Sequence, residues 1–154
     1  MVSAESRLLE LDIRLPQPPH PFGAYVEAVR TGNLLFLTGM LPVEDQTPKY
    51  VGRIGKELDE KLGRDAAHTA AINALAVARQ HLGSLDKVTR VVRLGIYMAT
   101  SGDNIDQPQV ADGASELFKA VFGVDRMSAR LVMGVASLPL GVPIELEVIL
   151  EVKA

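Results

Sequence analysis

Near the start of the chain, hydrophobic and polar residues alternate in a way that predicts strands. In LLELDIRL (residues 8–15) apolar and charged positions alternate, which is typical of a half-buried strand. Its apolar side consists of Leu9, Leu11, Ile13 and Leu15. The proline-rich stretch 16–23 then interrupts regular structure, because proline fixes φ and has no amide hydrogen to donate.

Residues 24–39 predict a hairpin of two short strands around a Thr31-Gly32-Asn33 turn. Its second strand, residues 34–37, is entirely apolar, so we expect it to be buried. The following segment, residues 41–63, is rich in proline, glycine and charge and predicts a long loop.

The hydrophobic period becomes helical between residues 64 and 82. Alanine and leucine recur every three or four positions there, and Gly83 suits the C-terminal cap. A β-branched stretch over 87–98 predicts a strand, and the stripe over 108–122 predicts a second helix that Gly123 ends. This order predicts an α/β (α+β) fold in which two helices cover one face of a mixed sheet.

The last part of the chain predicts a hairpin of two apolar strands around a Leu-Pro-Leu-Gly turn at 138–141. In the second strand, alternate residues from Ile144 to Val152 are expected to face the helices, with Glu145 and Glu147 on the other side. In the first strand we assign Leu131, Met133 and Val135 to the core and Arg130, Val132, Gly134 and Ala136 to the opposite face. Because that face mixes aliphatic and charged residues, we expect it to meet another copy of the chain.

Composition narrows the class of protein. The 154 residues fit one domain, 1–154, with a hydrophobic core. The absence of cysteine excludes disulfides, thiolate nucleophiles and cysteine-bound zinc. No apolar run approaches a membrane span, and the N-terminus lacks the features of a signal peptide, so we expect a cytoplasmic protein without a membrane partner. A net charge of −3 with only 5% aromatic residues disfavours nucleic acid as a partner.

Three segments together resemble the YjgF/YER057c/UK114 family, also called the Rid family of reactive-intermediate deaminases. They are FGAYVEAV, GNLLFLTGMLP and ARLVMGVASLPLGVPIELEV, in family order from Phe22 to Val148. The long 41–63 loop and the spacing of the second helix resemble a divergent branch. The resemblance implies a chorismate-mutase-like fold, a homotrimer, and small-molecule sites in clefts between subunits. It also implies hydrolysis of enamines and imines such as 2-aminoacrylate to 2-oxo acids and ammonia.

The same resemblance implies roles for particular residues. Arg130 matches the arginine that holds the substrate carboxylate, and Glu145 matches the acid that positions water. Arginine suits the first role because its planar fork binds a carboxylate through two hydrogen bonds. The family asparagine on the second helix matches either Asp112 or Ser115, and an aspartate there would repel a carboxylate. The remaining matches line the cleft or supply backbone contacts: Tyr25, Thr38, Gly39, Leu131 and Val132.

Geometry suggests that Arg130 and Glu145 belong to different chains. With the predicted turn, Gly134 lies opposite Glu145, and Arg130 is four residues further away, over 10 Å at ~3.3 Å per residue. No metal or organic cofactor is expected, and His20, His68 and His81 are expected on the surface. The main hypothesis is an enamine/imine deaminase. The alternatives are a non-catalytic protein that binds small carboxylates and, with less support, an endoribonuclease.

Overall fold

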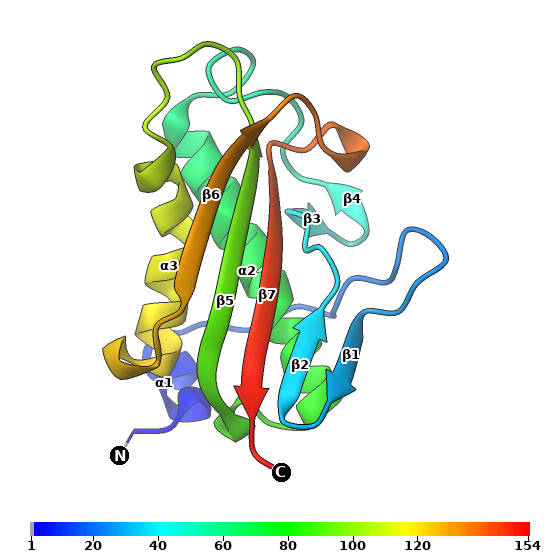
Figure 1. Cartoon of the computed structure of the whole chain (residues 1–154), viewed down its shortest axis with the longest axis vertical. Coiled ribbons are helices and arrows are strands. Elements are labelled where there is room, and N and C mark those ends of the chain that lie inside the picture. The colour runs from blue at the N-terminus through cyan, green and yellow to red at the C-terminus, as the bar shows by residue number, and fades with distance from the viewer. Residues whose placement is uncertain (1) are drawn as a thin grey trace.

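The computed structural model describes residues 2–154 and shows helices packed on one face of a five-stranded mixed sheet (Figure 1). The strand order is β1-β2-β7-β5-β6. The strands of this sheet are β1 (Ala28–Thr31), β2 (Leu34–Leu37), β5 (Val88–Ala99), β6 (Ala129–Val135) and β7 (Ile144–Val152). The helices are α1 (Ala4–Glu10), α2 (Glu60–Leu82) and α3 (Gln107–Phe122). The predicted fold class is therefore confirmed.

The first predicted hairpin is confirmed. β1 and β2 pair antiparallel with Thr31 opposite Leu34, so Gly32 and Asn33 form the turn, and Gly32 has a φ of +59°. β2 is less buried than its composition suggests. Leu35 and Leu37 face the core, whereas Phe36 is 40% exposed on the other face of the sheet.

Both predicted helices are present. α2 begins four residues earlier than predicted, because Asp59 caps it by accepting a hydrogen bond from the Leu62 amide at 2.8 Å. Gly83 caps its C-terminus, as predicted. The alanines let α2 approach α3 closely, and Gly113 lies at a tight point: a Cβ there would lie 2.2 Å from the Arg64 carbonyl oxygen. Among residues 2–154, no helix is both long and apolar enough to cross a bilayer.

The segment predicted as a loop, residues 41–63, contains a small second sheet. β3 (Val43–Glu44) pairs with β4 (Thr47–Pro48) across Asp45 and Gln46, both of which have positive φ. The rest of the segment before α2 is irregular, so the prediction of a long connection holds in outline.

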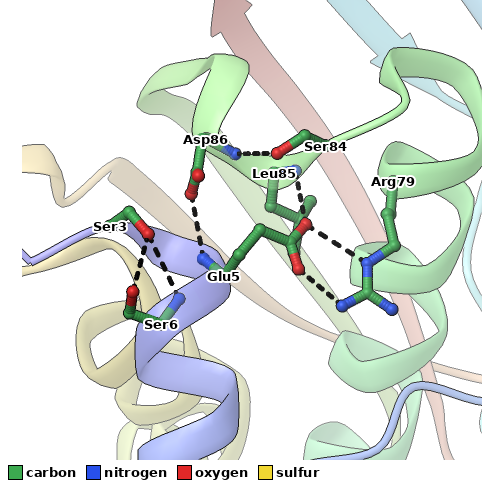
Figure 2. A network of polar contacts seen from close by, with 7 residues as sticks. All are labelled: Ser3, Glu5, Ser6, Arg79, Ser84, Leu85 and Asp86. Atoms are coloured by element: carbon green, nitrogen blue, oxygen red, sulfur yellow. Dashed lines mark hydrogen bonds and ion pairs between the residues drawn. The ribbon is translucent and has the colours of Figure 1, made fainter.

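The predicted N-terminal strand, residues 8–15, is wrong, because residues 8–10 are the end of helix α1 and residues 11–15 form no strand. Ser3 caps the helix, and Ala4 and Leu8, one turn apart, are buried against the core. Leu9, by contrast, is 83% exposed. Figure 2 shows how the helix is fastened: the Glu5 carboxylate accepts hydrogen bonds from Arg79 and from the Leu85 amide, and its own amide donates to Asp86. These contacts are distant in sequence, and the alternation in residues 8–15 does not reveal them.

The predicted C-terminal hairpin is also wrong. β6 and β7 are not neighbours, because β5 lies between them, parallel to β6 and antiparallel to β7 (Figure 1). Helix α3 connects β5 to β6, and these two strands are the only parallel pair in the described sheet. The turn before β7 is a short helical turn, Pro139–Gly141.

The two faces of β6 are reversed relative to the prediction. Arg130, Val132 and Gly134 align with Leu94, Ile96 and Met98, which are buried under the helices. Leu131 and Met133 instead lie on the open face and are 39% and 45% exposed. β6 is apolar on both faces, so its pattern does not indicate which side meets the helices. For β7 the prediction is confirmed, since alternate residues from Ile144 to Val152 are buried.

Candidate functional site

Glu145 and Gly39 are packed against each other in the candidate site. Glu145 is the second residue of β7 and lies on the open face of the sheet. Paired backbone hydrogen bonds between Met40 and Leu146 (2.8 and 2.9 Å) bring the end of β2 against β7. A Cβ added at Gly39 would lie 2.0 Å from Glu145 Oε2, so only glycine leaves room for this carboxylate.

Tyr25 and Thr38 lie beside the same two residues. Both line a small cavity together with Gly39 and Met40. The Tyr25 hydroxyl accepts a hydrogen bond from the Phe22 amide at 3.0 Å, and the Thr38 amide donates to the Glu27 carbonyl at 2.9 Å. The structure therefore brings four predicted residues together in one half-site: Tyr25, Thr38, Gly39 and Glu145.

The Glu145 carboxyl lies in a cavity of about 380 Å³, which Tyr97, Leu138 and Glu147 also line. Burial raises the pKa of Glu145 above its usual range, because the charged form loses hydration. Glu147, which lies two residues after Glu145 on the same face of β7, accepts a hydrogen bond from Arg93 Nε at 2.6 Å. A carboxyl whose pKa is raised by burial and which lines a cavity is a candidate functional group.

Arg130 forms a second half-site with α3. Its Nη1 donates to Asp112 Oδ1 at 2.6 Å and to Ser115 Oγ at 3.2 Å. The two candidates for the second-helix position thus both contact the arginine. Nη1 carries two hydrogens and uses both, while the Nε and Nη2 edge has no partner within residues 2–154. That edge has the geometry for a carboxylate that binds through both oxygens.

The two half-sites cannot meet within one chain. Tyr97 of β5 aligns with Glu145 on one side and with Met133 on the other, and Arg130 lies three residues before Met133. At ~3.3 Å per residue and ~4.8 Å per strand spacing, the two Cα atoms lie ~14 Å apart. They also project from opposite faces of the sheet, Arg130 toward α3 and Glu145 toward the open face. The separation inferred from sequence therefore holds, although the hairpin used to infer it does not exist.

Leu131 and Val132 follow Arg130 on β6, which pairs only with β5 among the described strands. Its outer edge consequently presents backbone groups beside the Arg130 half-site. Leu131 is exposed on the open face, and Val132 is half-buried against the core.

Another cavity, of about 740 Å³, contains none of the predicted site residues. It lies between the proline-rich segment, the β3–β4 hairpin and α2, and its wall mixes acids and bases, of which Lys49 and Glu44 pair with each other at 2.7 Å. His20 and His68 are on its rim, and all three histidines are exposed, as predicted. Within residues 2–154 no three acidic or histidine side chains are grouped so that they could hold a metal ion.

Comparison with known families decides the class of protein. Residues 5–150 match the family described as YjgF/chorismate mutase-like, which also carries a provisional endoribonuclease designation. This match covers nearly the whole chain and includes both half-sites. The chain belongs to the YjgF/Rid family.

Individual proteins are similar to this YjgF/Rid chain over almost their full length. Protein TCP17 of Trypanosoma cruzi is 35% identical over 149 residues, which are 96% of this chain and 93% of that protein. The 2-iminobutanoate/2-iminopropanoate deaminase of Dermatophagoides farinae is 31% identical over 92% of this chain and 95% of its own length. The crystal structure of Atu1372 from Agrobacterium tumefaciens, a protein of unknown function, has a TM-score of 0.88 at 34% identity, covering 97% of this chain and 92% of that one.

Sequence reasoning missed two polar residues of this YjgF/Rid chain that line the Glu145 cavity. The sequence already placed Glu147 on the same face of the strand as Glu145, two positions later, but Glu147 was not assigned to the site. Tyr97 could not be found from sequence, since its place opposite Glu145 depends on the pairing of β5 with β7.

Proposed function

We propose that this protein hydrolyses small enamines or imines that bear a carboxylate, producing 2-oxo acids and ammonia. We propose further that it works as a homotrimer, with each site in a cleft between two subunits. The observation that carries this proposal is the separation of the half-sites: Arg130 and Glu145 lie ~14 Å apart on opposite faces of one sheet. A three-carbon substrate can contact both only if they come from different copies of the chain.

The open face of the sheet supports the assembly. It carries exposed apolar residues beside Arg93 and Glu147, which form an ion pair with each other. Such a mixture is typical of a surface that meets another subunit. Its exposed apolar side chains are Val29, Phe36, Leu131 and Met133.

In the proposed reaction an enamine is first protonated on carbon to give the imine. Water then adds to the carbon of the C=N bond, its oxygen becomes the carbonyl oxygen of the 2-oxo acid, and the nitrogen leaves as ammonia. The free Nε and Nη2 edge of Arg130 holds the substrate carboxylate, while Asp112 and Ser115 fix the guanidinium from the Nη1 side. Glu145 orients the water and accepts its proton, a role that its raised pKa suits.

A second candidate function is binding of small carboxylates without turnover. The free Nε and Nη2 edge of Arg130 favours it, because this edge can hold a carboxylate whether or not Glu145 completes a reaction.

The deciding experiment supplies the purified protein with 2-aminoacrylate generated in place and follows ammonia and 2-oxo acid release. Faster release than in the uncatalysed reaction, lost in Arg130→Ala, supports the deaminase. Saturable 2-oxo acid binding without acceleration supports the binding protein instead. Light scattering gives the assembly, expected at three times the 16.6 kDa chain mass.

A further inference from the structure

Arg53 carries a positive charge that nothing within residues 2–154 neutralises. Its Nη2 donates to the Thr100 carbonyl at 2.6 Å, which fixes the direction of the guanidinium. Its Nε is buried and has no hydrogen-bond partner, and the side chain makes no ion pair within the described chain. Because Nε has almost no accessible surface, a ligand in the adjoining cavity would meet the rest of the guanidinium, whose charge is unpaired.

The guanidinium borders a polar cavity of about 480 Å³. The other lining residues are Thr100, Gly102, Asp103, Gln107 and Gly134–Ala136. Their position in the fold is informative, because β5 ends at Ala99 and β6 at Val135, so the cavity lies at the carboxyl ends of the parallel pair. In α/β units, ligands bind in the crevice outside the carboxyl ends of parallel strands.

The side chains of Gln107 and Thr100 both lie close to Gly134 in this cavity. A Cβ at Gly134 would lie 2.9 Å from Gln107 Nε2 and 3.0 Å from Thr100 Oγ1, so glycine lets an amide and a hydroxyl close over the end of β6. The first backbone amides of α3 do not contribute, because Gln107 donates to the Ile105 carbonyl, Pro108 has no amide hydrogen and Gln109 donates to Asp106. The donors available to a ligand are thus one guanidinium, one amide and one hydroxyl.

We propose that this cavity is a second binding site, for the oxyanion of a small carboxylate or phosphate. Arg53 supplies the charge, and Gln107 and Thr100 supply neutral hydrogen bonds. The site is distinct from the Arg130 half-site: Gly134 lies four residues from Arg130 along β6, ~13 Å at ~3.3 Å per residue. It does not depend on the proposed deaminase activity. Asp103, which is exposed and also lines the cavity, opposes anion binding and keeps the site weak.

The test is titration of the intact protein with inorganic phosphate and, separately, with acetate, at constant ionic strength, followed by NMR chemical shifts. We expect saturable shifts around Gln107 and Gly134 with at least one of the two anions, and comparing the two identifies the preferred chemistry. Arg53→Gln should weaken binding ten- to a hundred-fold, as loss of a charged hydrogen bond does. Asp103→Asn should strengthen it several-fold.

Two arginine variants serve as controls. Arg90 also donates to a backbone carbonyl, that of Asp125 at 2.8 Å, so Arg90→Gln matches the structural part of the change and should leave binding intact. Arg130→Gln should also leave it intact. If Arg53→Gln does not fold, Gln107→Ala, which keeps the charge, should weaken binding several-fold.

Several outcomes would overturn the proposal. If neither anion causes saturable chemical-shift changes, the cavity binds no small oxyanion. Loss of binding in Arg130→Gln with full binding in Arg53→Gln would place the anion at the other arginine. Dissociation of the assembly in Arg53→Gln, seen by light scattering, would make Arg53 a subunit contact instead.

Discussion

At the scale of single residues, the contact between Gly39 and Glu145 shows how a missing side chain shapes the site. Because a Cβ at position 39 would lie 2.0 Å from Oε2 and 2.9 Å from Cδ of Glu145, Gly39→Ala must displace the carboxylate. A displacement of about 1 Å costs roughly a hundred-fold in rate. We expect kcat to fall by about that factor, measured as ammonia release.

The control for this change is Gly32→Ala in the β1–β2 turn. Gly32 has a φ of +59° and nothing within 4 Å of an added Cβ, so alanine there meets backbone strain alone. It should lose about 1 kcal/mol of unfolding free energy, at the low end for a left-handed residue, and keep its activity. If both variants lose stability and activity together, Glu145 does not depend on the space at Gly39.

The pH dependence of the reaction should report Glu145. Burial raises its pKa, and its carboxylate is the proposed base, so the rate should increase as the pH rises through that raised value. Glu145→Gln should remove this increase from a pH–rate profile. Glu151→Gln, on the same face but further along β7, should keep it.

The same titration affects stability, with a definite sign. The folded chain holds the proton more tightly than the unfolded chain, so this stabilising contribution is present at low pH and lost as the pH rises through the raised pKa. Glu145→Gln should therefore be more stable than wild type at neutral pH, and the difference should shrink in acid. A glutamine variant that is less stable at neutral pH would contradict the assigned environment.

At the scale of elements, α1 depends on a few distant polar contacts (Figure 2). Glu5 accepts from Arg79 Nη2 at 2.6 Å and from the Leu85 amide at 2.8 Å, and these bonds lower its pKa, with the Arg79 hydrogen bond as the largest cause. Glu5→Gln should cost about 1–2 kcal/mol in urea unfolding at neutral pH, less than a fully buried pair because Arg79 is 40% exposed.

The contribution of the Glu5 carboxylate to the free energy of unfolding should vanish in acid. A lowered pKa gives stability that is present above the usual carboxyl value of 4.5 and lost as the pH falls through the lowered one. Wild type and Glu5→Gln should then have the same stability. Glu10→Gln, at the exposed end of the same helix, should have the stability of wild type at neutral pH.

At the scale of the whole molecule, the separated half-sites make a prediction about mixed assemblies. Arg130→Ala and Glu145→Gln should each be nearly inactive. Refolded together in equal amounts, they can form clefts in which one chain supplies Arg130 and its neighbour supplies Glu145. About a quarter of clefts should be wild type, because each draws independently on two chains of a closed ring.

Ammonia release by the mixture should therefore recover to a sizeable fraction of the wild-type rate. Subunit exchange is verified first with differently tagged chains. A mixture that exchanges and stays as inactive as its parents would show that the two residues do not act together across subunits.

The sequence by itself determined the elements whose signals are local. Helical periodicity located α2 and α3, the Gly32-Asn33 turn located the β1–β2 hairpin, and strict alternation assigned the faces of β7. The family motifs located the candidate site residues, which the structure gathers into two clusters. Each of these signals depends on residues that are close along the chain, and therefore on propensities that act before the chain is folded.

Only the tertiary structure decided the features that depend on distant partners. The helix α1 forms because Glu5 meets Arg79 and Leu85, and Leu8 meets the core, whereas its own alternation favours a strand. β5 enters between β6 and β7 because α3 carries the chain across the sheet as a parallel connection. β6 is apolar on both sides, so its phase was set by α3, which pairs with Arg130 through Asp112 and Ser115. Periodicity measures which residues share a face; which face meets the rest of the protein depends on long-range packing.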